Sequence, residues 1–189
     1  MQAEYRLTLP ALTAEQAQPL SRSLLEEAEA KLGFVPNMYR VMANSPGLLD
    51  TYIHGYTRFR EDSGFTPAEQ EVVLLAVSRE NGCSYCVAAH CFLADHMSKV
   101  PVDVTDAIRD GRPVADAKLA VLSAFSQTMV DSRGLPSRDD VAAFLGAGYS
   151  ERHILEIILA IAVKTLSNYA NHLFHTPVDD LFAARAWAG

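Results

Sequence analysis

The chain has very little alternation of polar and apolar residues, so β-strands are almost absent from its predicted structure. No stretch rich in glycine, serine and proline interrupts it, which favours one domain over residues 1–189. Its longest apolar run, Ile157 to Val163, is far too short to span a bilayer. The first residues, MQAEYRLTLPAL, lack the basic and apolar segments of a secretory signal. We therefore expect a soluble cytoplasmic protein without a membrane partner.

Positive charge is also scarce. The net charge is −7 and no basic stripe is present to neutralise phosphates, which argues against nucleic acid as a partner. The chain has no G-x-G-x-x-G motif and no Walker loop, so we expect no nicotinamide, flavin or nucleotide cofactor.

Helical signals are abundant. Thr66-Pro67-Ala68-Glu69 forms a capping box with proline in the first helical position, and Ser45-Pro46 begins the preceding helix. Further helices are predicted after Thr13 as far as Gly33, with a possible break at Pro19; from an N-cap at Asn37; around 102–110, 116–131 and 137–145; and from Ser150 to Thr176-Pro177. The 189 residues, 49% of them hydrophobic, suffice for a full core. The pattern predicts an all-α bundle of about eight to ten helices.

A short cluster of reactive residues follows the break expected at Gly82. Cys83, Cys86 and His90 have the spacing C-x-x-C-x-x-x-H, and Glu71 lies twelve positions before the first cysteine. In a helix, steps of three and four place the two thiols and the imidazole on one face. His90 is then the natural base for Cys86, and a chain reversal at Gly82 brings Glu71 near His90, where it can orient the ring.

Three chemical interpretations of these residues are open. In a reducing cytoplasm a C-x-x-C pair is more typical of redox chemistry or metal binding than of a structural disulfide. Zinc is the second interpretation, although no further C-x-x-C or H-x-x-x-H completes a ligand set. The third is a pair of small buried side chains. The spacing to histidine favours redox chemistry, while Cys91 is expected in the core and His54, His96 and His153 on the surface.

The sequence also contains a weak internal repeat. A shift of 85 positions places Glu71 on Glu156 and Arg79 on Lys164, and it places Cys83, Cys86 and His90 on Asn168, Asn171 and His175. We interpret this as a duplicated helix pair in which only the first copy kept the nucleophiles. Asn168, Asn171 and His175 are predicted to be structural polar groups.

At these residues the chain resembles the alkylhydroperoxidase D (AhpD) and carboxymuconolactone decarboxylase superfamily. The family motif is a glutamate, eleven residues and then C-x-x-C-x-x-x-H, which Glu71, Cys83, Cys86 and His90 match. The segments LGFVPNMYRVMANSPGLL and NYANHLF are similar to the branch called peroxidase-related enzymes, so the resemblance covers roughly Leu32 to Phe174. It implies an all-α fold with a duplicated helical unit and assembly into a homo-oligomer.

The resemblance also implies a function. Cys86 would be the peroxidatic thiol that reduces a hydroperoxide, Cys83 the resolving thiol, and His90 with Glu71 the proton relay. An external dithiol or disulfide-carrying reductant would restore the pair. Members that serve a peroxiredoxin often carry histidine before the second cysteine, where this chain has Tyr85. Decarboxylase members generally lack the cysteine pair, so lactone decarboxylation is not expected. The alternative is a thiol–disulfide reductase, or a redox sensor without peroxidase turnover.

Overall fold

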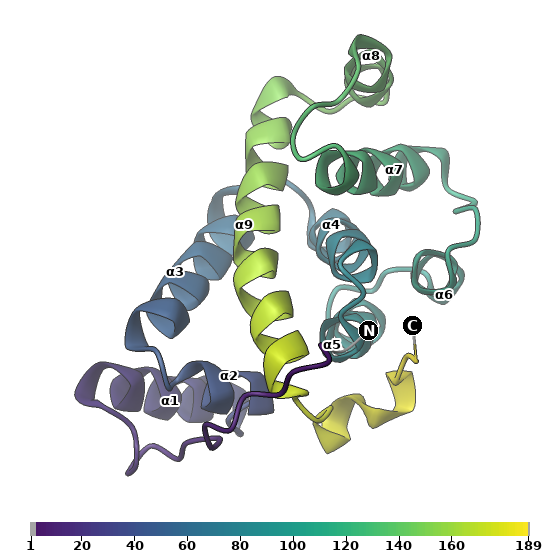
Figure 1. The fold of residues 1–189 in the computed structure, drawn as a ribbon. Helices are drawn as coiled ribbons and strands as arrows, with labels where there is room; N and C mark the ends of the chain where they lie inside the picture. The colour runs from purple at the N-terminus through teal and green to yellow at the C-terminus, as the bar shows by residue number, and fades with distance from the viewer. Residues whose placement is uncertain (1–2, 189) are drawn as a thin grey trace.

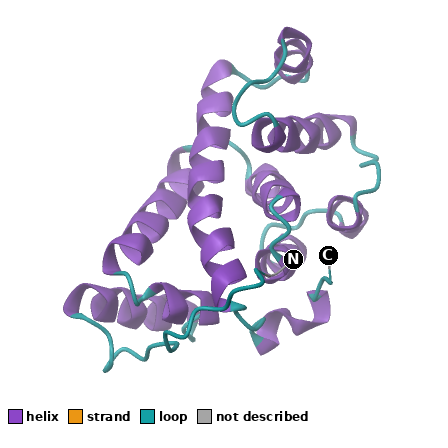
Figure 2. Ribbon diagram, viewed as in Figure 1, coloured by secondary structure: helices purple, strands orange, loops and turns teal. Residues whose placement is uncertain are grey.

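The fold consists of helices joined by loops, with no strand in residues 3–188, the part of the chain that this computed structural model describes (Figure 2). In chain order the helices are α1 Pro19–Leu32, α2 Asn37–Met42, α3 Pro46–Asp62, α4 Pro67–Glu80, α5 Ser84–His96, α6 Val102–Asp110, α7 Ala117–Asp131, α8 Arg138–Gly146, α9 Glu151–Phe174 and the 3₁₀-helix η1 Asp180–Arg185. The prediction of an all-α fold is confirmed.

Helix α9 runs through the middle of the molecule, with α3 on one side and α4, α5 and α7 on the other (Figure 1). The α3 and α9 backbones approach closely at Gly55, where an added Cβ would lie 2.6 Å from a methyl group of Val163. By length and composition α9 could cross a membrane. A core helix passes the same test, and α9 buries Ile157 and Ala160 among its neighbours.

Helix α4 is the most enclosed helix and carries the first candidate residue. Thr66 and Glu69 form the predicted capping box, and Pro67 occupies the first helical position. Every residue from Glu69 to Ser78 is buried, because α5, α6, α7 and α9 surround the helix. Polar groups on α4 therefore depend on partners from other helices.

The chain turns between α4 and α5 at the expected position. Gly82 has φ +67°, a left-handed conformation that glycine adopts without strain. Cys83 is the N-cap of α5, and its sulfur accepts a hydrogen bond from the backbone N–H of Cys86 at 3.4 Å. The turn places the thiol pair at the N-terminal end of α5, where the helix dipole favours negative charge.

Several local expectations differ from the structure. Helix α1 begins at Pro19 rather than running on from Thr13, since proline lacks the N–H that a helix interior needs. Asn37 is the first helical residue and not the N-cap, and its N–H donates to Asp179. The second copy of the repeat is one unbroken helix, α9, because no glycine interrupts it at Ser167, the counterpart of Gly82. Helix η1 was not predicted.

Candidate active site

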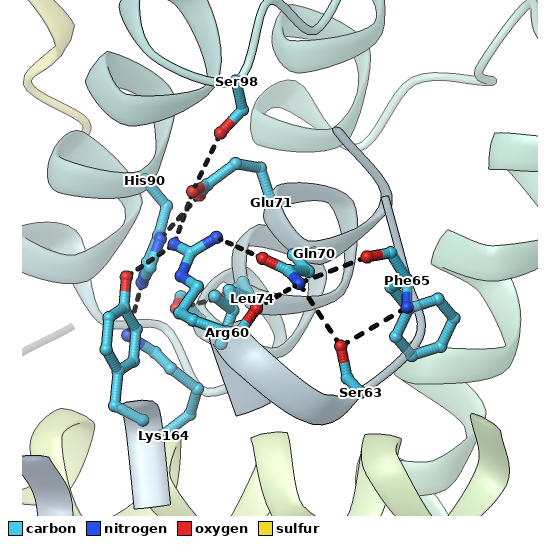
Figure 3. A network of polar contacts seen from close by, with 11 residues as sticks. Arg60, Ser63, Phe65, Gln70, Glu71, Leu74, His90, Ser98 and Lys164 are labelled. Carbon is cyan, nitrogen blue, oxygen red and sulfur yellow. Dashed lines mark hydrogen bonds and ion pairs between the residues drawn. The ribbon is translucent and has the colours of Figure 1, made fainter. Parts of the chain in front are cut away.

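Glu71 lies at the centre of a buried polar network (Figure 3). Its carboxylate, on α4, accepts hydrogen bonds from Arg60 on α3 and from Nδ1 of His90 on α5, the latter at 2.9 Å. Ser98 Oγ adds a longer contact of 3.5 Å. Burial raises the pKa of Glu71, but the hydrogen bond from His90 and the charge of Arg60 outweigh it and lower the pKa. The carboxylate is therefore ionised at neutral pH.

The second ring nitrogen of His90 is also occupied. Lys164 on α9 places its Nζ 2.8 Å from His90 Nε2. An ammonium group only donates, so Nε2 accepts, and the ring proton lies on Nδ1, which donates to Glu71. Burial and the charge of Lys164 lower the pKa of His90, with Glu71 acting in the opposite direction. His90 is thus neutral at neutral pH, in a single tautomer fixed from both sides.

The two thiols lie side by side near a third helix. Cys83 and Cys86 are each 1% exposed and are not joined in a disulfide. The side-chain amide of Asn171 on α9 donates to Cys86 Sγ at 3.3 Å and lies 3.9 Å from Cys83 Sγ. An amide donor stabilises a thiolate more than a thiol, because a hydrogen bond to an ionised acceptor is stronger.

The surroundings of the two thiols shift their pKa values in opposite directions. Burial raises the pKa of Cys83, and the neighbouring Cys86 raises it further. Burial also opposes ionisation of Cys86, but the hydrogen bond from the Cys83 thiol and the charge of Lys164 outweigh it, so its pKa lies well below the ordinary value. The pair therefore holds one thiolate, on Cys86, and one thiol that donates to it.

This asymmetry predicts the order of alkylation. At pH 7 we expect iodoacetamide to modify Cys86 first, at a rate near its high-pH plateau, because a free cysteine titrates only at about 8.5. Mass spectrometry of reduced protein, quenched over a range of pH, measures each thiol separately. Cys91 is the internal control, since burial raises its pKa to about 11. Modification of Cys83 before Cys86 would reverse the assignment.

A cavity of about 590 Å³ opens onto one of the two thiols. Cys86, His90, Lys164, Arg60 and Glu71 line its polar end, whereas Cys83 does not line it. Aromatic side chains form much of the remaining wall, namely Phe34, Tyr39, Tyr52, Tyr56, Tyr85, Phe92 and Phe182. The arrangement suits a mainly apolar small molecule that contacts the Cys86 thiolate and not Cys83.

Comparison with known proteins shows which protein family and which solved structures this chain is similar to. The model of the carboxymuconolactone decarboxylase family matches residues 46–127, which include the glutamate, both thiols and the histidine. The crystal structure of an alkylhydroperoxidase AhpD core, an uncharacterized peroxidase-related protein from Ralstonia eutropha JMP134, superposes with a TM-score of 0.81 at 22% identity, covering 92% of this chain and 93% of that one. Residues 46–127 thus match the carboxymuconolactone decarboxylase family, and the chain shares the fold of the AhpD core.

Two further structures share the AhpD-like fold. A peroxidase-related protein from Silicibacter sp. TM1040 has a TM-score of 0.76 at 21% identity, over 95% of this chain and 97% of that one. The debrominase Bmp8, as a cysteine-to-alanine variant in complex with 2,3,4-tribromopyrrole, has a TM-score of 0.75 at 17% identity, over 95% and 96%. No curated protein sequence matches the chain.

The structure brings all four residues of the AhpD motif into one cluster. The expected contact between Glu71 and His90 is present. The expected direct contact between His90 and Cys86 is not among the hydrogen bonds of residues 3–188, because Lys164 occupies Nε2. Sequence reasoning missed Arg60 and Lys164, and it assigned Asn171 a structural role although its amide contacts the thiols.

Tyr85, which stands where some AhpD-like proteins have histidine, contacts the C-terminal segment of the chain. Its hydroxyl donates to Asp179 and accepts from the N–H of Met38. Its ring packs edge-on against Phe182 of η1, with centroids 6.3 Å apart. Tyr85 thus ties the C-terminal segment over the cavity, and its hydroxyl is directed to Asp179.

The other histidines and Cys91 lie outside the network. Cys91 is a fully buried core thiol, as expected, and His153, expected on the surface, completes the capping box of α9 with Ser150. His175 contacts the carbonyl of Ala3. In residues 3–188 no group of three or more metal-binding side chains is present. Since both nitrogens of His90 already have partners, the Cys₂His zinc interpretation has no free imidazole.

Proposed function

We propose that the protein is a thiol-dependent peroxidase of the AhpD type that reduces organic hydroperoxides. The observation that carries this proposal is that Cys86, of lowered pKa, lines the apolar cavity, while the neighbouring Cys83 does not line it. The match to the carboxymuconolactone decarboxylase family model and the peroxidase-related structural neighbours support an enzyme of this type. We also propose that it works in the cytoplasm, where a thiol pair is kept reduced.

The chemistry proceeds in two steps. The Cys86 thiolate attacks the terminal oxygen of R–O–OH, the O–O bond breaks, and the alkoxide takes a proton to leave as R–OH. Cys86 is then a sulfenic acid, and Cys83 attacks its sulfur to form the disulfide and release water. Each turnover thus takes two electrons from the thiol pair to reduce one peroxide. An external dithiol returns these electrons by thiol–disulfide exchange.

The burial of the pair favours a particular reductant. Both sulfurs are almost completely buried, so a flat protein surface does not reach the disulfide. A small dithiol, or one carried on a flexible arm, enters through the cavity. We propose this class of partner, and we propose a homo-oligomeric assembly as the resemblance implies.

Turnover with a dithiol tests the function. One equivalent of cumene hydroperoxide should lower the free thiols from three to one per chain, since Cys91 does not take part. Dithiothreitol should restore them, and excess peroxide should then be consumed over many cycles. A redox sensor would be oxidised once, slowly, and would not cycle.

A second candidate rests on the aromatic cavity. The neighbour with bound 2,3,4-tribromopyrrole is a debrominase, and an apolar cavity at a thiolate also suits a brominated aromatic ring. The reaction converts Ar–Br and two thiols to Ar–H, HBr and a disulfide, so the same electron supply serves it. Bromide release from tribromopyrrole, measured beside cumene hydroperoxide consumption in the turnover assay, decides between the two.

A further inference from the structure

Lys164 is a charged group of the network that lies outside the AhpD motif, as Arg60 does. It lies near the middle of α9, is 1% exposed, and reaches the polar end of the cavity beside Cys86 and His90. In Figure 3 its chain rises from α9 toward the imidazole. The charge of Lys164 acts on Cys83, Cys86 and His90 from α5. The other titratable groups that line the cavity with it include Tyr52, Tyr56 and Arg60 from α3, Glu71 from α4 and Tyr85 from α5.

The charges of this cluster balance only if Lys164 pairs with a thiolate. Arg60 neutralises Glu71, with which it forms an ion pair. His90 carries no charge in the tautomer that Lys164 and Glu71 impose. A buried ammonium group needs a counterion. Burial keeps the Tyr56 hydroxyl neutral by raising its pKa. Cys86 shares the cavity with Lys164 and takes the charge of that lysine as a stabilising contact, so the ammonium and the thiolate form the second pair.

The histidine alone is poorly placed to protonate a product in the cavity. Its single proton lies on Nδ1 and is held by Glu71, while Nε2 accepts from Lys164. Asn171 and the Cys83 thiol donate to the reacting sulfur itself. The Lys164 ammonium lines the cavity with that sulfur, so its protons are available to a product held there.

We propose that Lys164 is the general acid that protonates the leaving alkoxide, with His90 and Glu71 positioning it. This role rests on the proposed peroxidase function. The Cys86 thiolate forms the S–O bond and the O–O bond breaks. One N–H proton of Lys164 passes to the alkoxide oxygen, which gives Cys86–SOH, R–OH and a neutral Lys164 amine. Charge balances, since one anion and one cation become neutral groups.

The later steps restore the ammonium. The neutral amine takes the proton of the Cys83 thiol as that sulfur attacks Cys86–SOH, and it returns the proton to the departing hydroxide as water. When an external dithiol reduces the disulfide, its two protons end on Cys83 and on Lys164, and Cys86 is again a thiolate. The ion pair is therefore regenerated once in each cycle.

Two peroxides and two variants test the role of Lys164. Peracetic acid expels a carboxylate, which needs no proton to leave, whereas tert-butyl hydroperoxide expels an alkoxide, which does. In Lys164→Met the ratio of the peracetic acid rate to the tert-butyl hydroperoxide rate should rise on the order of 100-fold, the scale of a lost general acid. The ratio is independent of the fraction of folded protein, because both rates fall together with that fraction.

Lys164→Arg separates charge from proton donation. Arginine keeps the positive charge beside Cys86 but stays protonated in proteins. Its iodoacetamide reactivity at Cys86 should therefore resemble that of wild type, while its rate ratio rises as in Lys164→Met. If both variants lose rate equally on the two peroxides, Lys164 only favours the thiolate and the donor role is overturned. If the wild type consumes peracetic acid but not tert-butyl hydroperoxide, the general-acid role of Lys164 is overturned while the peroxidase function stands. If the wild type consumes neither peroxide, both the role and the function are overturned.

Discussion

Cys86→Ser should lose all peroxide consumption, whereas Cys83→Ser should still complete the first step. The hydroxyl of serine does not ionise near neutral pH and is a weak nucleophile without a base of its own. In Cys83→Ser the Cys86 thiolate still faces the cavity, so one equivalent of cumene hydroperoxide is reduced and Cys86 remains as a sulfenic acid. Dimedone labelling followed by peptide mass spectrometry locates the adduct.

The third cysteine provides the matched control for this experiment. Cys91 is fully buried and does not line the cavity, so Cys91→Ala should retain turnover with dithiothreitol. A dimedone adduct on Cys83 in Cys86→Ser would exchange the roles of the two thiols. That result would also conflict with the geometry, because Cys86 lines the cavity and Cys83 does not.

Local sequence signals were sufficient for most of the fold. Thr66 and Pro67 mark the start of α4, and Gly82 marks the reversal that makes α4 and α5 neighbours. The contact between Glu71 and His90 follows from these signals, because the reversal sets one helix against the next. Each of these features depends on residues close together in sequence, which is why spacing and caps predict them.

The missed site residues come from helices distant in sequence. Arg60 lies on α3, and nothing near it in sequence indicates that its guanidinium meets a carboxylate on α4. The last helical segment, η1, is held by Asp179 to Tyr85, 94 positions away in sequence. Such contacts depend on how whole helices pack, which periodicity within one helix does not specify.

The sequence does carry a signal for a buried Lys164. Ile157, Ala160, Lys164, Asn168 and Asn171 recur at steps of three and four, so they share one face of α9. All five are buried. A lysine on an apolar face, in line with two asparagines, indicates a buried charge with a specific partner, because lysine is almost never fully buried unless paired.

Glu71→Gln should be the most destabilising polar substitution in the site, lowering the free energy of unfolding by about 3 kcal/mol. Arg60 and His90 donate to different oxygens of the Glu71 carboxylate, so a glutamine amide turns its NH₂ group toward one of these donors. The neutral side chain also leaves the Arg60 charge without its partner. The matched control is Glu156→Gln, the repeat counterpart, whose partner Arg152 has a side chain 66% exposed. That change should stay within about 0.5 kcal/mol. Urea unfolding of both variants at pH 7 measures the difference.

The pH dependence and a double variant identify the cause. The pKa of Glu71 is lowered in the folded protein, so its carboxylate stabilises the fold fully above the ordinary value of 4.5. This contribution is lost as the pH falls through the lowered pKa, and the gap between wild type and Glu71→Gln should narrow there. Combining Glu71→Gln with Arg60→Met should cost less than the sum of the two, because no unpaired buried charge then remains. Additive costs, or equal effects of Glu71→Gln and Glu156→Gln, would mean that Glu71 contributes packing rather than the central charge of the network.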